Sequence, residues 1–304
     1  ILVLLDGDLE EAGLLFRQAA EEDTYALAPY VGLTRIAQAR DDPAQESTWR
    51  LKLAESYYAT GRFEKALDEA LAVRRMRPGG PENTYLLGDI YAALGRAEAA
   101  IREYERFIDQ AEADGEVYFK LGLQYDSLGR YPEAVDRFRE ALRFFPENHE
   151  LYYYIGLEYR IMEEYDQAVR AFERALELDP DNAQYLFQLG VSHERMGEVA
   201  TAIEYLQRSV SIDDSSASAL NYLGYLLADL GLRLEDAHGY IRKALDMDPN
   251  NGAYLDSMGW VYFKMSEYRQ AREYLEDAVS HMDSSEQENY VIFDHLGDVY
   301  LKLN

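Results

Sequence analysis

The chain has 304 residues, of which 30 are Lys or Arg and 57 are Asp or Glu, so its formal charge at pH 7 is −27. A surface this acidic disfavours nucleic acids and anionic membranes as partners, because both bind clustered basic side chains. The sequence contains no cysteine, which excludes disulfides, thiolate metal sites and cysteine nucleophiles.

The first 46 residues predict helices of an incomplete or degenerate repeat. Residues 9–23 have the pattern of a second helix, and residues 25–40 have that of a first helix with Gly32 at its small central position. This first helix runs through residues 41–47 directly into another first helix. Either the repeat is degenerate, or residues are absent between about 40 and 47. Because the chain begins at Ile1, we expect it to be an internal fragment.

A small residue then recurs, with the first six examples each 34 positions apart. The last two gaps are 35 and 38 residues. The recurring residues are Ala54, Gly88, Gly122, Gly156, Gly190, Gly224, Gly259 and Gly297. Such a period is typical of repeat proteins, in which each unit stacks only on its neighbours.

Each unit predicts two helices joined by a turn. The first helix carries a leucine before the small residue and usually a tyrosine three positions after it. The second carries a recurring alanine followed four positions later by a large apolar residue. We expect the small residues to let the two helices approach closely, while the large side chains fill the space around them. The seven full units are 47–80, 81–114, 115–148, 149–182, 183–216, 217–251 and 252–289, and residues 290–304 form the first helix of a truncated repeat.

This pattern resembles the tetratricopeptide repeat over nearly the whole chain. The resemblance implies an all-α fold, a right-handed solenoid of antiparallel helix pairs. In such solenoids the first helices line the concave face and the second helices form the convex back. The asparagine ladder of some sugar transferases with this fold is absent. Its position reads Lys52, Leu86, Lys120, Tyr154, Gln188, Tyr222, Ser257 and His295.

The resemblance assigns two positions of each first helix to the concave groove. The position three before the small residue is aromatic in four successive units. The position just after the small residue is apolar or aromatic in five. The predicted ligand-binding residues are Tyr85, Phe119, Tyr153, Phe187, Leu123, Leu157, Val191, Tyr225 and Trp260.

Acidic residues accompany this aromatic stripe. The predicted acidic groove positions are Glu82, Glu116, Glu150, Asp256, Asp294 and Asp298. An exposed apolar stripe usually marks an interaction site. Two other interpretations stay open: the rings could be buried against the next repeat, or another part of the protein or a second copy could fill the groove. The acidic residues could equally reflect the charge of the whole chain.

The spacing of the helices limits what could bind. Packed helices lie about 8–10 Å apart. An extended peptide, at about 3.3 Å per residue, would therefore place an anchor at roughly every third residue. A bound helix, at about 1.5 Å per residue, would place one at roughly every seventh. We expect a protein or peptide partner with apolar anchors and a basic end.

The sequence shows no catalytic constellation. The five histidines, His149, His193, His238, His281 and His295, are scattered over different units. No metalloprotease, nucleophile-elbow or phosphate-loop motif is present. We therefore expect no catalytic residues, no bound metal and no cofactor. No run approaches the roughly 18 apolar residues of a membrane span, so we expect no direct membrane insertion by this segment.

The C-terminal third also resembles bacterial tetratricopeptide proteins of the cell envelope. The shared features are the NNGAYLDSMGW run at 250–260 and the DHLGD run at 294–298. This resemblance implies a periplasmic or outer-membrane-anchored bacterial adaptor, with a processing protease as one partner. A cytoplasmic location is the alternative.

The sequence thus predicts a non-enzymatic scaffold or adaptor that binds a protein segment in an aromatic groove. One alternative is a homo-oligomer that stacks through its terminal helices. Another is a non-catalytic repeat region of a larger envelope protein or enzyme.

Overall fold

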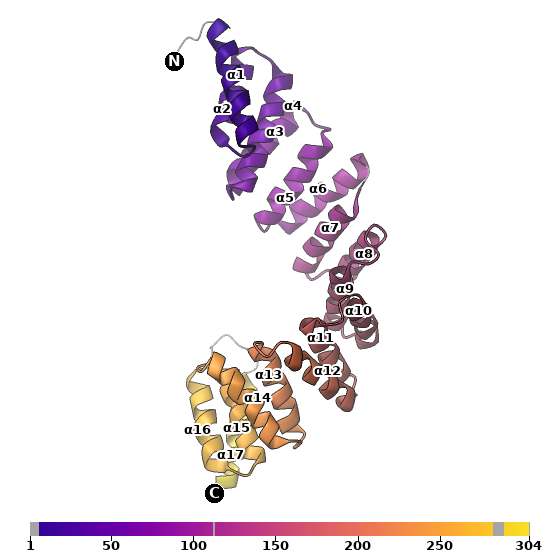
Figure 1. Ribbon diagram of the computed structural model, residues 1–304, viewed down its shortest axis with the longest axis vertical. Helices are drawn as coiled ribbons and strands as arrows, with labels where there is room; N and C mark the ends of the chain where they lie inside the picture. Colours follow the sequence, from indigo (N-terminus) through magenta and orange to yellow (C-terminus); the bar gives the residue numbers. More distant parts are fainter. Residues whose placement is uncertain (1–5, 112, 282–288, 304) are drawn as a thin grey trace. The chain divides into compact units, whose positions relative to one another are not determined.

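The computed structural model describes residues 6–111, 113–281 and 289–303, and these fold entirely as α helices and their connections (Figure 1). Their bounds are α1 Asp6–Glu22, α2 Leu27–Ala39, α3 Pro43–Ala59, α4 Phe63–Met76, α5 Pro81–Ala93, α6 Ala97–Gln110, α7 Gly115–Ser127, α8 Tyr131–Leu142, α9 His149–Ile161, α10 Tyr165–Leu178, α11 Ala183–Arg195, α12 Val199–Ile212, α13 Ala217–Asp229, α14 Leu234–Met247, α15 Gly252–Lys264, α16 Tyr268–Ser280 and α17 Asn289–Leu303.

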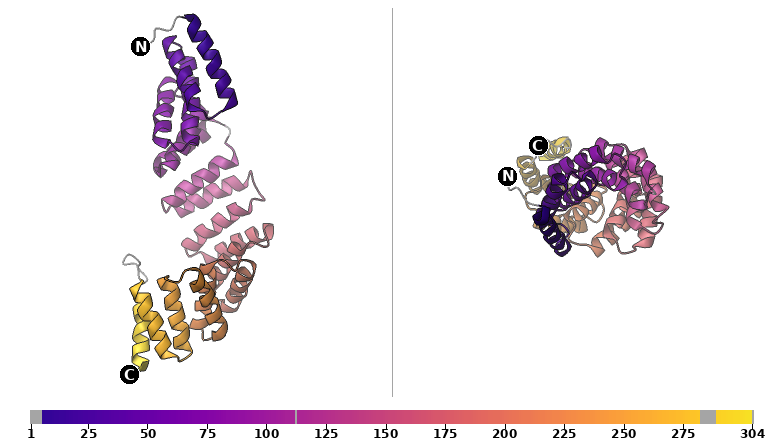
Figure 2. Two further views of the ribbon diagram at one scale, coloured as in Figure 1. Left: turned by 60° about the vertical axis from the view of Figure 1, so that its left-hand side comes forward. Right: turned by 90° about the horizontal axis from the view of Figure 1, so that it is seen from above.

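The contacts divide the chain into two parts, which meet in the sequence between Glu147 and Asn148. Helices α1 to α8 form the N-terminal part, and α9 to α17 form the C-terminal part. Within each part, helices that are consecutive in the chain pack side by side (Figure 2). This is the predicted solenoid of helix pairs. None of the described helices is long and apolar enough to cross a membrane.

The turn within each helix pair follows one pattern. The central residue has a positive φ, as at Gly61, where φ is 71°. The next N–H then donates back to the first helix, as from Arg62 to the carbonyl of Tyr57 at 2.8 Å. Glycine suits this left-handed conformation because it has no Cβ.

The same turn joins α2 to α3. Asp41 has a φ of 50°, and the N–H of Asp42 donates to the carbonyl of Ala37 at 3.0 Å. The Asp42 carboxylate also caps α3 by accepting from the N–H of Gln45. The chain therefore passes directly from one predicted first helix into the next. Helix α3 begins at Pro43, four residues before the predicted boundary at 47.

In six of the first helices, the small residue receives a large side chain from the paired helix. A Cβ built on Gly156 would lie 2.5 Å from a ring atom of Phe172, which is fully buried. The same close approach occurs in other pairs, at Gly88 with Tyr104, Gly122 with Phe138, Gly190 with Leu206, Gly224 with Ile241 and Gly259 with Leu275. The predicted role of the small residues in helix approach is thus observed at each of these pairs.

Candidate functional site

The predicted ligand-binding positions lie on the first helices, and we call the surface that they form within each part the first-helix face of that part. Its members in the N-terminal part are Tyr85, Phe119 and Leu123, and those in the C-terminal part are Tyr153, Leu157, Phe187, Val191, Tyr225 and Trp260. Most of these side chains are half-buried, while Val191 and Trp260 are buried. Each part is described in turn.

In the N-terminal part, the Tyr85 ring sits in an aromatic cluster. Its centre lies 5.0 Å from that of Phe107 and 6.0 Å from that of Tyr104. The Lys120 ammonium lies 4.5 Å from the centre of the Tyr85 ring, a cation–π contact. Burial raises the pKa of Tyr85 to about 12, so its hydroxyl stays protonated at neutral pH.

A charged network adjoins this ring. The Lys120 Nζ atom lies 2.9 Å from the Oδ1 atom of Asp89, to which the Tyr104 hydroxyl also donates at 2.7 Å. Lys120 makes a second ion pair with Glu116 at 3.1 Å. Desolvation lowers the pKa of Lys120, but its hydrogen bonds to Tyr85 and Asp89 outweigh this and raise it. Lys120 is therefore a fixed positive charge held between two carboxylates.

The network was not among the predicted binding residues, although one sequence signal could have found it. Asp89 occupies the position after the small residue, and Lys120 occupies the absent asparagine ladder of the next unit. Opposite charges at these two positions, 31 residues apart, join consecutive first helices. The other predicted residues of this part, Phe119 and Leu123, are half-buried. Phe119 packs against the buried ring of Phe138, with 5.9 Å between their centres.

In the C-terminal part, Tyr153 is surrounded by aromatic rings. Its ring centre lies 5.1 Å from that of Tyr185 and 5.9 Å from that of Phe172. The Gln184 amide of the next first helix donates to the Tyr153 hydroxyl. Burial raises the pKa of Tyr153 above its ordinary value. One side of the Tyr153 ring therefore packs against buried aromatic residues. The rest of the side chain stays exposed to solvent.

Phe187 pairs with a residue that the sequence reasoning did not select. Its ring meets that of Tyr222 edge to face, at a centre-to-centre distance of 5.5 Å. The Tyr222 hydroxyl donates to the Glu194 carboxylate at 3.2 Å, and burial raises the pKa of Tyr222 to about 12. Phe187 in α11 and Tyr222 in α13 are both half-buried, and their ring contact joins these two first helices.

The last predicted aromatic residue, Trp260, is held by contacts on several sides. Its indole stacks on the His295 ring at 4.0 Å, and its Nε1 atom donates to the Oδ1 atom of Asp229 at 3.2 Å. The Lys264 ammonium lies 4.7 Å from the indole centre and donates to the backbone carbonyl of Asp229. Tyr225 lies beside this group, with its ring centre 6.2 Å from that of His295.

The predicted acidic positions differ in exposure. Glu82, Glu116, Glu150, Asp294 and Asp298 are exposed. Asp256 is only 6% exposed and is bonded to the Nδ1 atom of His295 at 2.9 Å. Asp256 therefore acts as an internal partner for His295, and the exposed carboxylates are the ones that a ligand can reach.

No group of three or more potential metal ligands occurs within the described ranges. The side chains of the first-helix face offer aromatic surface, hydroxyl groups and carboxylates. Such a surface can hold apolar side chains of a ligand and attract basic ones.

Comparison with family models identifies the repeat. A model described as tetratricopeptide repeat matches residues 32–81, 51–116, 85–149, 119–160 and 153–217 in overlapping segments. A second tetratricopeptide repeat model matches residues 253–280. Together these matches span more than half of the chain.

One curated relative is the TPR repeat-containing protein PA4667 of Pseudomonas aeruginosa. It is 36% identical over 78 residues, which are 26% of this chain and 12% of that protein. The chain therefore matches only a small part of this relative's length.

Solved structures share the fold, and two of the following three are described as tetratricopeptide repeat proteins. A protein from Parabacteroides merdae is 18% identical, with a TM-score of 0.62 and coverage of 86% of this chain and 100% of that chain. MamA from Desulfovibrio magneticus is 20% identical, with a TM-score of 0.52 and coverage of 56% and 95%. YrrB, described as a TPR protein with an unusual peptide-binding site, is 18% identical, with a TM-score of 0.53 and coverage of 68% and 96%.

Proposed function

Because the chain belongs to the tetratricopeptide repeat family, we propose that it is a non-enzymatic scaffold whose first-helix face binds a segment of a partner protein. The observation that carries this proposal is the row of half-buried rings at Tyr153, Phe187 and Tyr225 on successive first helices of the C-terminal part. A side chain that keeps part of its ring in water can gain further burial when a ligand covers it.

The ligand that suits this face has apolar anchors and basic residues. Its anchors would cover the accessible parts of the rings, and its basic residues would face exposed carboxylates such as Glu150. YrrB, with its unusual peptide-binding site, provides a precedent within this fold. The Lys120 network gives the N-terminal part a different character, because its ammonium is already neutralised by Asp89 and Glu116.

A peptide array tests this proposal. The array would present extended and helical peptides with leucine or phenylalanine at intervals of about three or seven residues, each with and without lysine at one end. We expect the chain to retain peptides with these anchors and to prefer those with lysine. Retention that does not depend on the anchors would contradict the proposal.

Matched variants locate the binding surface. The Tyr153→Leu/Phe187→Leu variant keeps apolar bulk but removes two rings, and we expect it to bind at least about tenfold more weakly, or ~1.4 kcal/mol. Tyr205→Leu is the control, because Tyr205 is a half-buried ring on the second helix α12 that stacks on His193 at 5.3 Å. Equal loss in both variants would place binding outside the first-helix face.

A second candidate function is self-association through α17. Gly297, the small residue of this helix, has open space where a Cβ would be, unlike the glycines of the complete pairs. Large apolar side chains flank it, with Tyr290 70% exposed and Phe293 55% exposed. In an antiparallel pair of α17 helices, Phe293 of one copy would lie opposite Gly297 of the other.

Charge opposes that pairing at low salt. Asp294 and Asp298 lie along the edge of the same surface, and the chain as a whole carries −27. Self-association should therefore strengthen as salt screens the repulsion. Light scattering over a dilution series at low and high salt tests this, with Phe293→Ser as the variant. A mass that stays monomeric at every concentration and salt level would exclude it.

The resemblance of the C-terminal third supports a further proposal, a bacterial envelope location with a processing protease as one partner. Fractionation of cells that express the full-length gene would test the location. Recovery of the protein in the cytoplasm alone would contradict it.

A further inference from the structure

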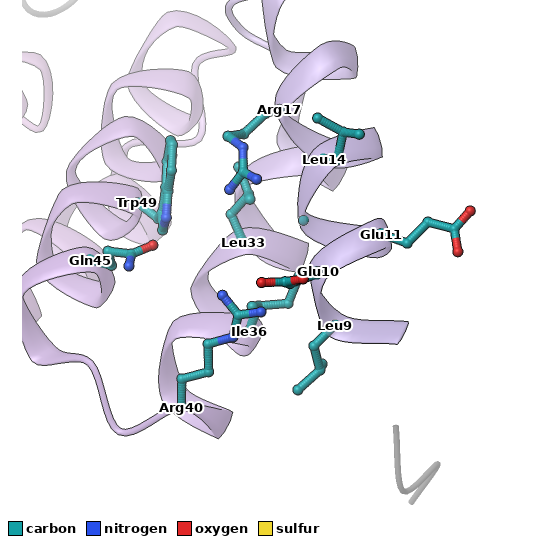
Figure 3. Close-up of a pocket in the computed structure, with 11 residues that line it drawn as sticks. Leu9, Glu10, Glu11, Leu14, Arg17, Leu33, Ile36, Arg40, Gln45 and Trp49 are labelled. Atoms are coloured by element: carbon teal, nitrogen blue, oxygen red, sulfur yellow. The ribbon is translucent and has the colours of Figure 1, made fainter. Parts of the chain in front are cut away.

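A cavity of about 410 Å³ lies between α1, α2 and α3, away from the first-helix residues described above (Figure 3). Its inner surface is aliphatic, made by Leu9, Leu33 and Ile36, all of which are buried. The half-buried indole of Trp49 forms one wall. Ligand pockets are commonly a few hundred Å³, so this cavity has the size of one, and its lining combines these apolar side chains with polar ones such as Gln45.

A buried ring on the side away from the cavity fixes the position of the Trp49 indole. Its ring stacks on that of Tyr30 in α2 at a centre-to-centre distance of 6.4 Å, and Tyr30 is only 4% exposed. A buried neighbour of this size limits the rotation of the indole. The wall is therefore present before any ligand arrives, which lowers the entropy lost on binding.

Two arginines from different helices contribute to the cavity. Figure 3 shows the Arg17 guanidinium directed toward Leu33 and Trp49, and the Arg40 guanidinium directed toward Ile36 and Glu10. Two nitrogens of Arg17 lie 3.6 and 3.8 Å from the position of a Cβ built on Gly13. The Arg17 side chain is thus folded back along its own helix, in van der Waals reach of the Gly13 position.

Within the described part of the chain, neither guanidinium makes an ion pair. Nearby Arg50 shows the contrast, since it pairs with both Glu46 and Glu69. Both arginines are exposed, and Arg40 interacts with the Asp42 carboxylate only at longer range, so both guanidiniums are accessible to an anionic ligand.

The carboxylates near the cavity limit how much negative charge the bound anion can carry. Glu11 points away from the cavity, whereas the Glu10 carboxylate lies near its Arg40 side (Figure 3). Asp42 is a second carboxylate that interacts with Arg40, so the two guanidiniums suit at most a singly charged anion and disfavour a doubly charged phosphate group. The apolar surface requires an apolar body next to that charge.

We propose that this cavity binds a monocarboxylate attached to an apolar group. Arg17 and Arg40 hold the carboxylate, while Leu33, Ile36 and Trp49 receive the apolar group. Two kinds of molecule carry a carboxylate next to an apolar group. One is a free medium-chain acid, and the other is a peptide whose C-terminal residue is apolar. The site is separate from the first-helix face, so the proposal does not depend on the proposed scaffold function.

The test uses the indole N–H signals of the whole chain, which contains two tryptophans. Trp49 reports on the cavity, and Trp260, in the C-terminal part, is an internal reference; a Trp49→Phe variant assigns the two signals. The probes are octanoate, with octanol as its uncharged control, and a leucine-terminated dipeptide, with its amide as the uncharged control. We expect a saturable shift of the Trp49 signal alone, with the acids and not with the controls.

Variants then separate recognition of the anion from filling of an apolar cavity. Arg17→Gln should weaken acid binding by at least about tenfold. Arg35→Gln, which removes an exposed arginine of α2 outside the cavity, should leave it unchanged. Saturation by octanoate alone would identify a free acid, and saturation by the dipeptide alone would identify a chain terminus. No Trp49 shift with either acid, equal shifts with acids and controls, or unchanged binding in Arg17→Gln would overturn the proposal.

Discussion

The Nδ1 atom of His295 in α17 lies 2.9 Å from the Oδ1 atom of Asp256 in α15, and both side chains are buried. The His295 ring also stacks on Trp260 at 4.0 Å. These contacts fasten the last helix to α15 and use two of the positions that the sequence assigns to a ligand. At this end of the first-helix face, Asp256 and Trp260 therefore pack against the next repeat and are not accessible to a ligand.

Replacement of His295 by leucine should destabilise the C-terminal part. The substitution leaves the buried Asp256 carboxylate without its partner, at a cost of about 2–3 kcal/mol. Urea denaturation followed by circular dichroism measures the loss. The double variant Asp256→Leu/His295→Leu should recover much of it, because no buried charge remains. A single variant as stable as the parent would show that the pair contributes nothing to stability.

Gly156→Ala should lower the free energy of unfolding by about 1–3 kcal/mol, since the added methyl must displace Phe172. Gly239→Ala is the matched control, because the exposed Gly239 of α14 has open space around its Cβ position. That control should be stabilising by about 0.5–1 kcal/mol through reduced freedom of the unfolded chain. Thermal or urea denaturation compares the two. Similar effects at both sites would disprove the steric account.

The salt bridge between α4 and α6 gives a prediction for the N-terminal part. Two nitrogens of Arg74 contact the two carboxylate oxygens of Glu103, whose side chain is only 8% exposed. Arg74→Met should cost about 2 kcal/mol, less than for a fully buried pair, because Arg74 is partly in water and Arg106 still pairs with Glu103. Arg143→Met is the control, since its ion pair with Glu140 is largely exposed. Chemical denaturation should show a loss only in the first variant.

Stability should fall at alkaline pH. Burial raises the pKa of Tyr85, Tyr185, Tyr222 and Tyr225 to about 12, above the ordinary value of 10.0. In the unfolded chain these hydroxyls ionise near the ordinary value, whereas in the folded chain they stay protonated. Their contribution is therefore complete below about pH 10 and is lost as pH rises toward about 12.

Urea denaturation over this pH range measures the effect. Tyr222→Phe should make the decline less steep, because phenylalanine cannot ionise. Tyr25→Phe, at a tyrosine that is 56% exposed, should leave the slope as it is. A free energy of unfolding that does not change over this range would contradict the assignment.

The sequence by itself determined the repeat. A period of 34 residues, small residues matched to large ones, and turn glycines such as Gly61 and Gly95 predicted the helix pairs that the structure contains. These features are local, because each follows from helix geometry and from the conformational freedom of glycine. The same pattern left the junction near residues 40–47 open. In the structure, a tight turn joins the two helices there, and Asp41 adopts in it a conformation that glycine provides elsewhere.

Only the tertiary structure decided how exposed each predicted site residue is. Tyr225 and Trp260 both come just after the small residue of their units, yet Tyr225 is half-buried and Trp260 is buried. The difference arises from partners that the repeat pattern does not specify, namely Asp229, Lys264 and His295 around Trp260. The Arg17 and Arg40 cavity was equally hidden from the sequence, because three helices must pack before the two guanidiniums share a wall. A repeat pattern fixes which residues face each other, while burial depends on the particular side chains that meet there.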